Sequence, residues 1–136
     1  MHEKRGSIKY LERYKQLNDF TGLRYQRNIT PSDIDGVIDF GGNAFVFLEG
    51  KLIGAPAQIG QDILFKNLCD SIVKSGLQAI VIYYHHNEPP DKIINVSECD
   101  VFKKYWNGEF SDVKFITVSE AIEVVIGYWR RNNIQL

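Results

Sequence analysis

The sequence contains few cysteines and no apolar run long enough to cross a bilayer. Cys69 and Cys99 are the only cysteines in 136 residues, and they form no CxxC motif. This usage fits a reducing compartment and a fold that needs no disulfide bonds. No apolar segment follows the polar residues between Met1 and Gly6, so we expect no signal peptide. We therefore expect a cytoplasmic protein without a membrane partner.

The chain also lacks an excess of positive charge. It carries 16 basic and 17 acidic residues, for a net charge of −1. Proteins that bind DNA without sequence preference usually have a clear positive excess, so the balance argues mildly against nucleic acid. A metal-dependent nuclease is a partial exception, because it concentrates acids at its centre and needs only a local basic rim. Such a rim could come from the basic residues between Lys4 and Arg27, or from those near Lys103 and Arg130.

Several catalytic signatures are missing. The sequence has no internal repeat, no Ser-His-Asp order, no phosphate-binding Walker loop and no dinucleotide fingerprint. His85 and His86 are adjacent on an expected strand, so they point to opposite faces and are poor joint metal ligands. The length and the ordinary hydrophobic content of 44% predict one domain over residues 1–136.

Apolar periodicity predicts an α/β fold with the element order α-β-β-α-β-(β-β)-α. The hairpin signal Asn107-Gly108 is preferred over a helix from Ser97 to Gly108. Thr117 and Glu120 form a capping box that opens the last helix. Helices are expected at about 8–20, 60–76 and 117–131, and strands at 33–40, 44–51, 78–84 and 113–116.

The most informative segment is the expected hairpin from Asp33 to Lys51, which turns at Gly-Gly-Asn. Side chains alternate along a strand, so Asp33, Asp35 and Asp39 share one face of its first strand. On the second strand, Glu49 and Lys51 share a face with Phe45 and Phe47. Charges beside aromatic residues on a strand face are unfavourable unless they have a task. Acids and an ammonium at the far end of a hairpin could hold a divalent metal and a phosphodiester.

This part of the sequence has an acid on one expected strand, Glu-x-Lys on the next strand and Gln at the start of the following helix. The pattern resembles the PD-(D/E)xK nuclease superfamily. The matching residues here are Asp35, Glu49, Lys51 and Gln61. The sequence around residues 30–36 and 60–61 looks like that of small phage- or prophage-encoded members of this superfamily. The resemblance covers roughly residues 8–84. The literal Pro-Asp pair is absent because Ser32 separates Pro31 from Asp33. Asp33 and Asp39 therefore remain alternatives to Asp35 as the first acid.

The resemblance implies a restriction-endonuclease-like αβββαβ core with a mixed central sheet flanked by helices. It also implies a DNA-cleaving nuclease that uses Mg²⁺ or Mn²⁺, in which Asp35, Glu49 and the carbonyl of Gly50 hold the metal. Lys51 would orient the attacking water and stabilise the transition state. Gln61 would hydrogen-bond a phosphate oxygen or the nucleophile. Glu12, on the first helix, is a further candidate acid by the same resemblance.

Several alternatives stay open at this level. A junction-resolvase-like endonuclease, which would suit a homodimer, competes with an exonuclease, because Gln61 also resembles that subgroup. In the exonuclease reading, Phe65 stands where an aromatic partner, Tyr, is expected four residues after the Gln. Either enzyme would act in phage or mobile-element DNA processing, in the cytoplasm of a bacterial host. From another class, the chain could be a non-catalytic module that binds nucleic acid or protein, with Glu49 and Lys51 as a surface ion pair of little energetic value.

Overall fold

The computed structural model describes residues 10–17 and 19–136, and its contacts divide the chain into two units, residues 1–33 and 34–136. The first unit contains a short helix α1, Leu11–Tyr14, and a 3-10 turn η1, Gln26–Asn28. The helix expected over residues 8–20 is thus only one turn long in the described part. Of the apolar stripe expected there, Tyr14 and Leu17 are exposed, so these two side chains add little packing to stabilise a longer helix, and Ile8 lies outside the described residues.

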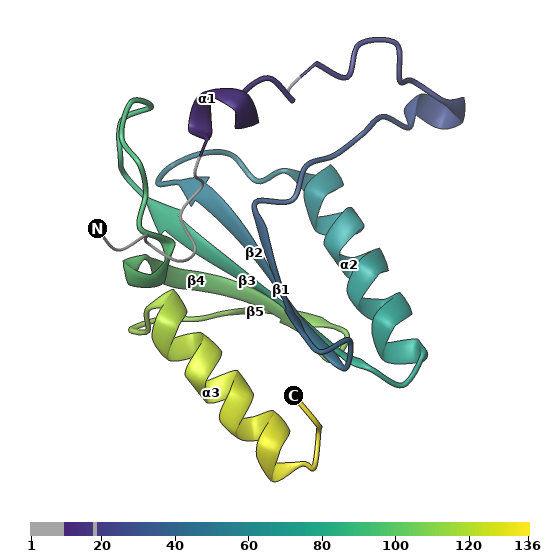
Figure 1. The fold of residues 1–136 in the computed structure, drawn as a ribbon, viewed down its shortest axis with the longest axis vertical. Helices are drawn as coiled ribbons and strands as arrows, with labels where there is room; N and C mark the ends of the chain where they lie inside the picture. Colours follow the sequence, from purple (N-terminus) through teal and green to yellow (C-terminus); the bar gives the residue numbers. More distant parts are fainter. Residues whose placement is uncertain (1–9, 18) are drawn as a thin grey trace. The chain divides into compact units, whose positions relative to one another are not determined.

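The second unit is a five-stranded mixed sheet whose strands lie in sequence order. The strands are β1, Gly36–Phe40; β2, Ala44–Leu52; β3, Gln78–His86; β4, Asp100–Trp106; and β5, Glu109–Asp112. Only β2 and β3 are parallel; the other neighbours are antiparallel. Helix α2, Ile59–Lys74, connects β2 to β3, the turn η2, Val96–Glu98, precedes β4, and helix α3, Val118–Arg131, follows β5 (Figure 1). The α/β class, with a mixed sheet flanked by helices, is confirmed.

Most of the expected elements are present. The two hairpins turn at Gly41-Gly42 and at Asn107-Gly108, with positive φ at all four residues, and α3 opens with the expected capping box. The strand expected at 113–116 is wrong. Val113 and Ile116 each make a backbone hydrogen bond to β4, but Phe115 between them has a φ of 62° and breaks the ladder. No helix in the described residues is long and apolar enough to span a membrane.

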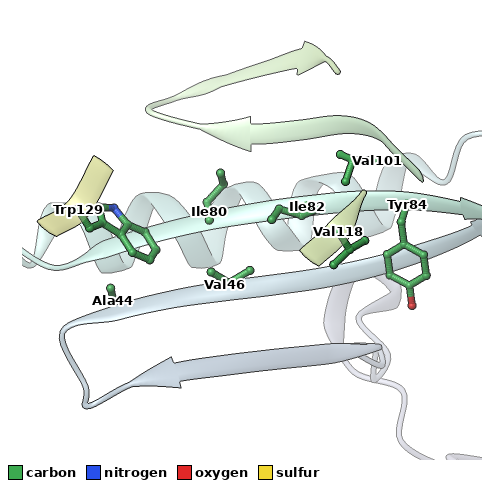
Figure 2. Close-up of a cluster of buried hydrophobic side chains, with 8 residues drawn as sticks. All are labelled: Ala44, Val46, Ile80, Ile82, Tyr84, Val101, Val118 and Trp129. Carbon is green, nitrogen blue, oxygen red and sulfur yellow. The ribbon is translucent and has the colours of Figure 1, made fainter. Parts of the chain in front are cut away.

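Alternation along β2 divides the core into two layers. Ala44 and Val46 point toward α3, whereas Phe47 points toward α2. Figure 2 shows the α3-side cluster, in which Trp129 and Val118 of α3 lie over side chains from β2 and β3. The α2-side cluster joins Phe65 and Cys69 of the helix to buried strand residues: Phe47, Ala79, Val81, Tyr83 and Tyr105.

The parallel pairing of β2 and β3 positions the charged end of the hairpin. The strands align from Ala44 opposite Gln78 to Leu52 opposite His86. Parallel strands joined by a helix bring their carboxyl ends to one edge of the sheet, where α2 also begins. Glu49, Lys51 and the first turn of α2 therefore meet at this edge.

Candidate functional site

Glu49 lies at the centre of the charged end of the β1–β2 hairpin. Its side chain is on the α2 side near the end of β2, and within the described residues it is the only charged residue that is buried, at 6% exposed. Its Oε2 accepts a hydrogen bond from Nε2 of Gln61 at 3.1 Å, and its Oε1 lies 3.5 Å from Nζ of Lys51. Burial raises the pKa of the Glu49 carboxyl, and the negative charge of Asp35 raises it further, against the opposing effect of Lys51 and Gln61.

Asp35 lies just before β1 and is held by the backbone of β2. Paired residues of β1 and β2 end at Gly36 opposite Leu48, so the N–H of Gly50 lies beyond the ladder. The Asp35 carboxylate accepts that N–H at 2.8 Å. The hydrogen bond fixes the acid near Glu49, as its effect on the Glu49 pKa indicates. The structure thus brings Asp35, Glu49, Lys51 and Gln61 together.

The other candidate acids have different positions. Asp39 lies opposite Phe45 at the turn end of the hairpin, where its carboxylate accepts the N–H of Gly42 at 2.6 Å. It stabilises the turn and is not part of the Glu49 cluster. Asp33 and Glu12 belong to the first unit, where Glu12 lies 3.5 Å from Lys15. A role for Glu12 as an additional acid stays a prediction.

Lys51 is unusually enclosed for a lysine at a strand end. Its side chain is 14% exposed, and besides Glu49 its ammonium donates to Oε1 of Gln58 at 3.2 Å. Gln58 is the residue before α2, yet its side chain does not cap the helix. Sequence analysis missed Gln58. Gln58 comes three residues before Gln61 at the start of the same helix, and this spacing could have identified it as a site residue.

Gly50 and Tyr84 form a second feature that sequence analysis missed. A Cβ on Gly50 would lie 2.7 Å from Cε2 and 2.8 Å from the hydroxyl oxygen of Tyr84. The two residues are paired across β2 and β3, and the phenol lies across the glycine backbone on the α3 side. Burial raises the pKa of Tyr84, and the charge of Asp35 adds to the shift, so the phenol keeps its proton. The position of Gly50 inside a strand could have indicated that another group approaches its backbone closely.

A neighbouring polar cluster holds the start of α2 against the sheet. Asp62, next to Gln61, accepts hydrogen bonds from the Tyr83 hydroxyl at 2.9 Å and from Nζ of Lys103 at 3.2 Å. The Lys103 ammonium also lies 4.3 Å from the centre of the Tyr83 ring. These contacts connect α2 to β3 and β4, and so fix the turn of helix that presents Gln61 to Glu49.

His85 lies at the same edge. It is the strand partner of Lys51, and its ring stacks on Phe102 with centres 3.7 Å apart and planes 6° apart. Phe102 packs against the α2-side cluster, which places the His85 ring on the Lys51 side of the sheet. His86 follows on the opposite face, in agreement with the expected alternation.

The donor set fits a hard divalent cation. The described residues contain no group of three or more His, Cys, Asp or Glu side chains arranged to hold a metal. Mg²⁺ needs fewer, because it keeps several waters and is commonly bound by one or two carboxylates plus substrate oxygens. The carboxylates of Asp35 and Glu49, with the carbonyl of Gly50 between Glu49 and Lys51, form a donor set of this kind.

Comparison with known proteins adds no relative. No family model, no curated protein and no solved structure matches the chain. Functional inference therefore depends on the geometry around Glu49.

Proposed function

We propose that the chain is a metal-dependent nuclease that hydrolyses phosphodiester bonds in DNA, with its active site at Asp35, Glu49, Lys51 and Gln61. The observation that carries the proposal is the buried carboxylate of Glu49. It is contacted by an enclosed ammonium and a helix amide, and a second carboxylate is fixed nearby on the Gly50 N–H.

A purely structural role explains this arrangement poorly. A buried ion pair rarely stabilises a protein more than apolar side chains of similar size would. The neighbours on this face, Phe47 and Phe65, are buried and aromatic, so an apolar residue in place of Glu49 would extend the core. Asp35 adds a like charge to the group, which further opposes folding. Groups that oppose folding in this way are typical of functional sites.

The residues supply the parts that phosphodiester hydrolysis needs. A Mg²⁺ or Mn²⁺ ion held by Asp35, Glu49 and the Gly50 carbonyl would supply positive charge to polarise the phosphoryl group and to activate water. Lys51 can donate to a non-bridging phosphate oxygen or to the attacking water, and so offset negative charge that develops in the transition state. Gln58 holds the Lys51 ammonium in place without neutralising it. Gln61 orients the Glu49 carboxylate through Oε2.

The position of Phe65 favours an endonuclease over an exonuclease. The exonuclease reading requires an aromatic partner four residues after Gln61. Phe65 is completely buried, with its ring 5.9 Å from Phe47 and 6.0 Å from Tyr83, so it has no access to a substrate. A resolvase-like endonuclease does not require an aromatic partner at this position.

The alternative is a module that keeps this architecture and binds nucleic acid or protein without turnover. The net charge of −1 favours it, because binding by phosphate neutralisation alone would require more cations. Retention of both acids together with Lys51 favours the enzyme, since a binding module does not need this combination.

Cleavage of a substrate panel tests the proposal. Linear duplex, single-stranded, flap and four-way-junction DNA, with RNA as a fifth substrate, would be incubated with Mg²⁺ or Mn²⁺. The proteins compared are the wild type, Lys51→Met, Glu49→Gln and the control Lys114→Met, which changes an exposed loop lysine. We expect metal-dependent cutting by the wild type and the control, and a loss of about a hundredfold or more in the other two. If the folded wild type binds DNA but cuts none of these substrates, the enzyme proposal is wrong and the binding module takes its place.

A further inference from the structure

A cavity of about 210 Å³ lies on the opposite face of the sheet from Glu49 and Lys51. Ile80 and Ile82 of β3 line it on the sheet side, and Ala121 and Val125 line it from α3. Trp129 also lines it, and all these residues belong to or pack against the α3-side cluster. The cavity is therefore an apolar space between α3 and the sheet, separate from the proposed active site.

The cavity is accessible from solvent along α3. Val124 and Tyr128, which both line it, are 61% and 40% exposed. They are four residues apart and so lie on one side of the helix. The rings of Trp106 and Tyr128 contact each other with centres 5.0 Å apart, so a small molecule would enter past the exposed Val124.

Trp129, which lines the cavity, has an unpaired donor. Its side chain is completely buried, and its Nε1 has no hydrogen-bond partner within the described part of the chain. Figure 2 shows this nitrogen on the edge of the indole away from Ala44. A buried N–H without an acceptor is unfavourable, and native proteins rarely leave one without a reason. Because the nitrogen has almost no accessible surface, an acceptor oxygen of a ligand would satisfy it only if the indole moved toward the cavity.

Two cations also line the cavity. Lys104 and Arg131 form no ion pair with a carboxylate among residues 10–17 and 19–136, although Lys104 lies 5.4 Å from the ring centre of Trp106. The adjacent Lys103, on the other face of β4, does pair with Asp62. Unpaired cations beside an apolar cavity favour a ligand that is apolar at one end and anionic at the other.

We infer that this cavity binds a small aromatic carboxylate. A cavity of about 150 Å³ accommodates a benzene ring, so the volume here suits one ring with a short acidic arm. The ring would contact Ile80 and Ile82. The carboxylate would lie near the charges of Lys104 and Arg131. The inference is independent of the proposed nuclease activity.

Phenylacetate is the probe, and phenylacetamide is its uncharged analogue of nearly the same shape. The full chain, labelled with ¹⁵N, would be titrated with each while the two indole N–H signals are followed by NMR; Trp106→Phe identifies the Trp129 signal. We expect phenylacetate to shift the Trp129 signal saturably, with a Kd of about 1 mM or lower. The amide should bind about tenfold more weakly, because it lacks the charge.

Variants locate the binding. Lys104→Met and Arg131→Met should each weaken phenylacetate binding about fivefold to tenfold. Arg130→Met, an exposed neighbour on α3 that does not line the cavity, should leave binding unchanged. Ala121→Leu should abolish binding by filling the space while the protein stays folded. An unshifted Trp129 signal at saturating probe, equal affinity for the amide, or equal weakening by Arg130→Met would overturn the inference.

Discussion

Gly50 and Tyr84 face each other across β2 and β3 so closely that position 50 has no room for a Cβ, which would lie 2.7 Å from the tyrosine ring. The contact fixes the backbone between Glu49 and Lys51, the two charged residues of the proposed site. It also packs the protonated Tyr84 phenol against Gly50, whose carbonyl is one of the candidate metal ligands.

This contact predicts the effect of Gly50→Ala. The added methyl must displace the Tyr84 ring or the strand, so we expect the free energy of unfolding to fall by about 1–3 kcal/mol. Urea denaturation followed by tryptophan fluorescence measures it. Gly60→Ala is the matched control, because a Cβ there meets nothing within 4 Å. Equal stability of the two variants would contradict the close approach, whereas a smaller loss in a Tyr84→Leu background would support it.

Glu49 predicts a pH-dependent difference between the wild type and Glu49→Gln. Burial and Asp35 raise the pKa of Glu49 above 4.5 in the folded chain. Below pH 4.5 the carboxyl is protonated in both the folded and unfolded chains. As the pH rises from there through the folded pKa, the unfolded chain ionises first, and the stability that Glu49 contributes is lost.

We therefore expect Glu49→Gln to gain stability relative to the wild type as the pH rises from about 4 to 8, without added metal. Denaturant midpoints of both proteins over this range measure the difference. Glutamine keeps an acceptor for Gln61, so the comparison isolates the charge. A difference that shrinks with rising pH would mean that Lys51 dominates and that the carboxylate stabilises the fold.

The fold was more predictable from sequence than the site. The hairpins at Gly41-Gly42 and Asn107-Gly108, and the capping box at Thr117, are local signals, and all three are present. Phe115 was not predictable, because an apolar residue in a β-like segment gives no sign that its φ is 62°. The choice between Asp35 and Asp39 needed the register, since both residues lie on the same face of one strand.

Other parts of the site depend on contacts between distant segments. Tyr84 approaches Gly50 only because the crossover through α2 aligns β2 and β3 in one particular register. Gln58 accepts from Lys51 across the connection between the end of β2 and the start of α2. Neither contact has a periodicity or spacing that a single sequence would reveal.

Metal binding should be detectable as stabilisation. If Asp35 and Glu49 share a cation, Mn²⁺ should raise the Tm of the wild type, because it relieves the repulsion between them and binds only the folded chain. Glu49→Gln and Asp35→Asn should lose most of this increase. Asp39→Asn is the control, because it removes a charge at the turn end of the hairpin and keeps an acceptor for Gly42. Differential scanning fluorimetry makes the comparison, and an equal response from Asp39→Asn would indicate binding elsewhere.

Asp62 should matter more for stability than an exposed ion pair does. Asp62→Ala leaves the Tyr83 hydroxyl and the half-buried Lys103 ammonium without their shared acceptor, so we expect a loss of about 2–4 kcal/mol. Lys66→Ala, which breaks an exposed pair with Asp70, should lose much less stability, because solvent screens that pair. Urea denaturation of both variants measures the contrast. Similar losses would mean that the Asp62 cluster does not hold the start of α2.

The two adjacent histidines give a matched pair for testing which face carries the proposed cleavage. The His85 ring is on the Lys51 side, held flat against Phe102, and is well placed to contact a phosphodiester bound at Glu49 and Lys51. His85→Gln should slow DNA cleavage by about tenfold to a hundredfold and change stability by no more than about 1.5 kcal/mol, the value of an aromatic contact. His86→Gln changes the other face and should leave cleavage close to that of the wild type. Single-turnover cleavage rates with each variant measure the effect. A larger loss in His86→Gln would place the substrate on the α3 side and remove the basis for assigning the active site to the Glu49 cluster.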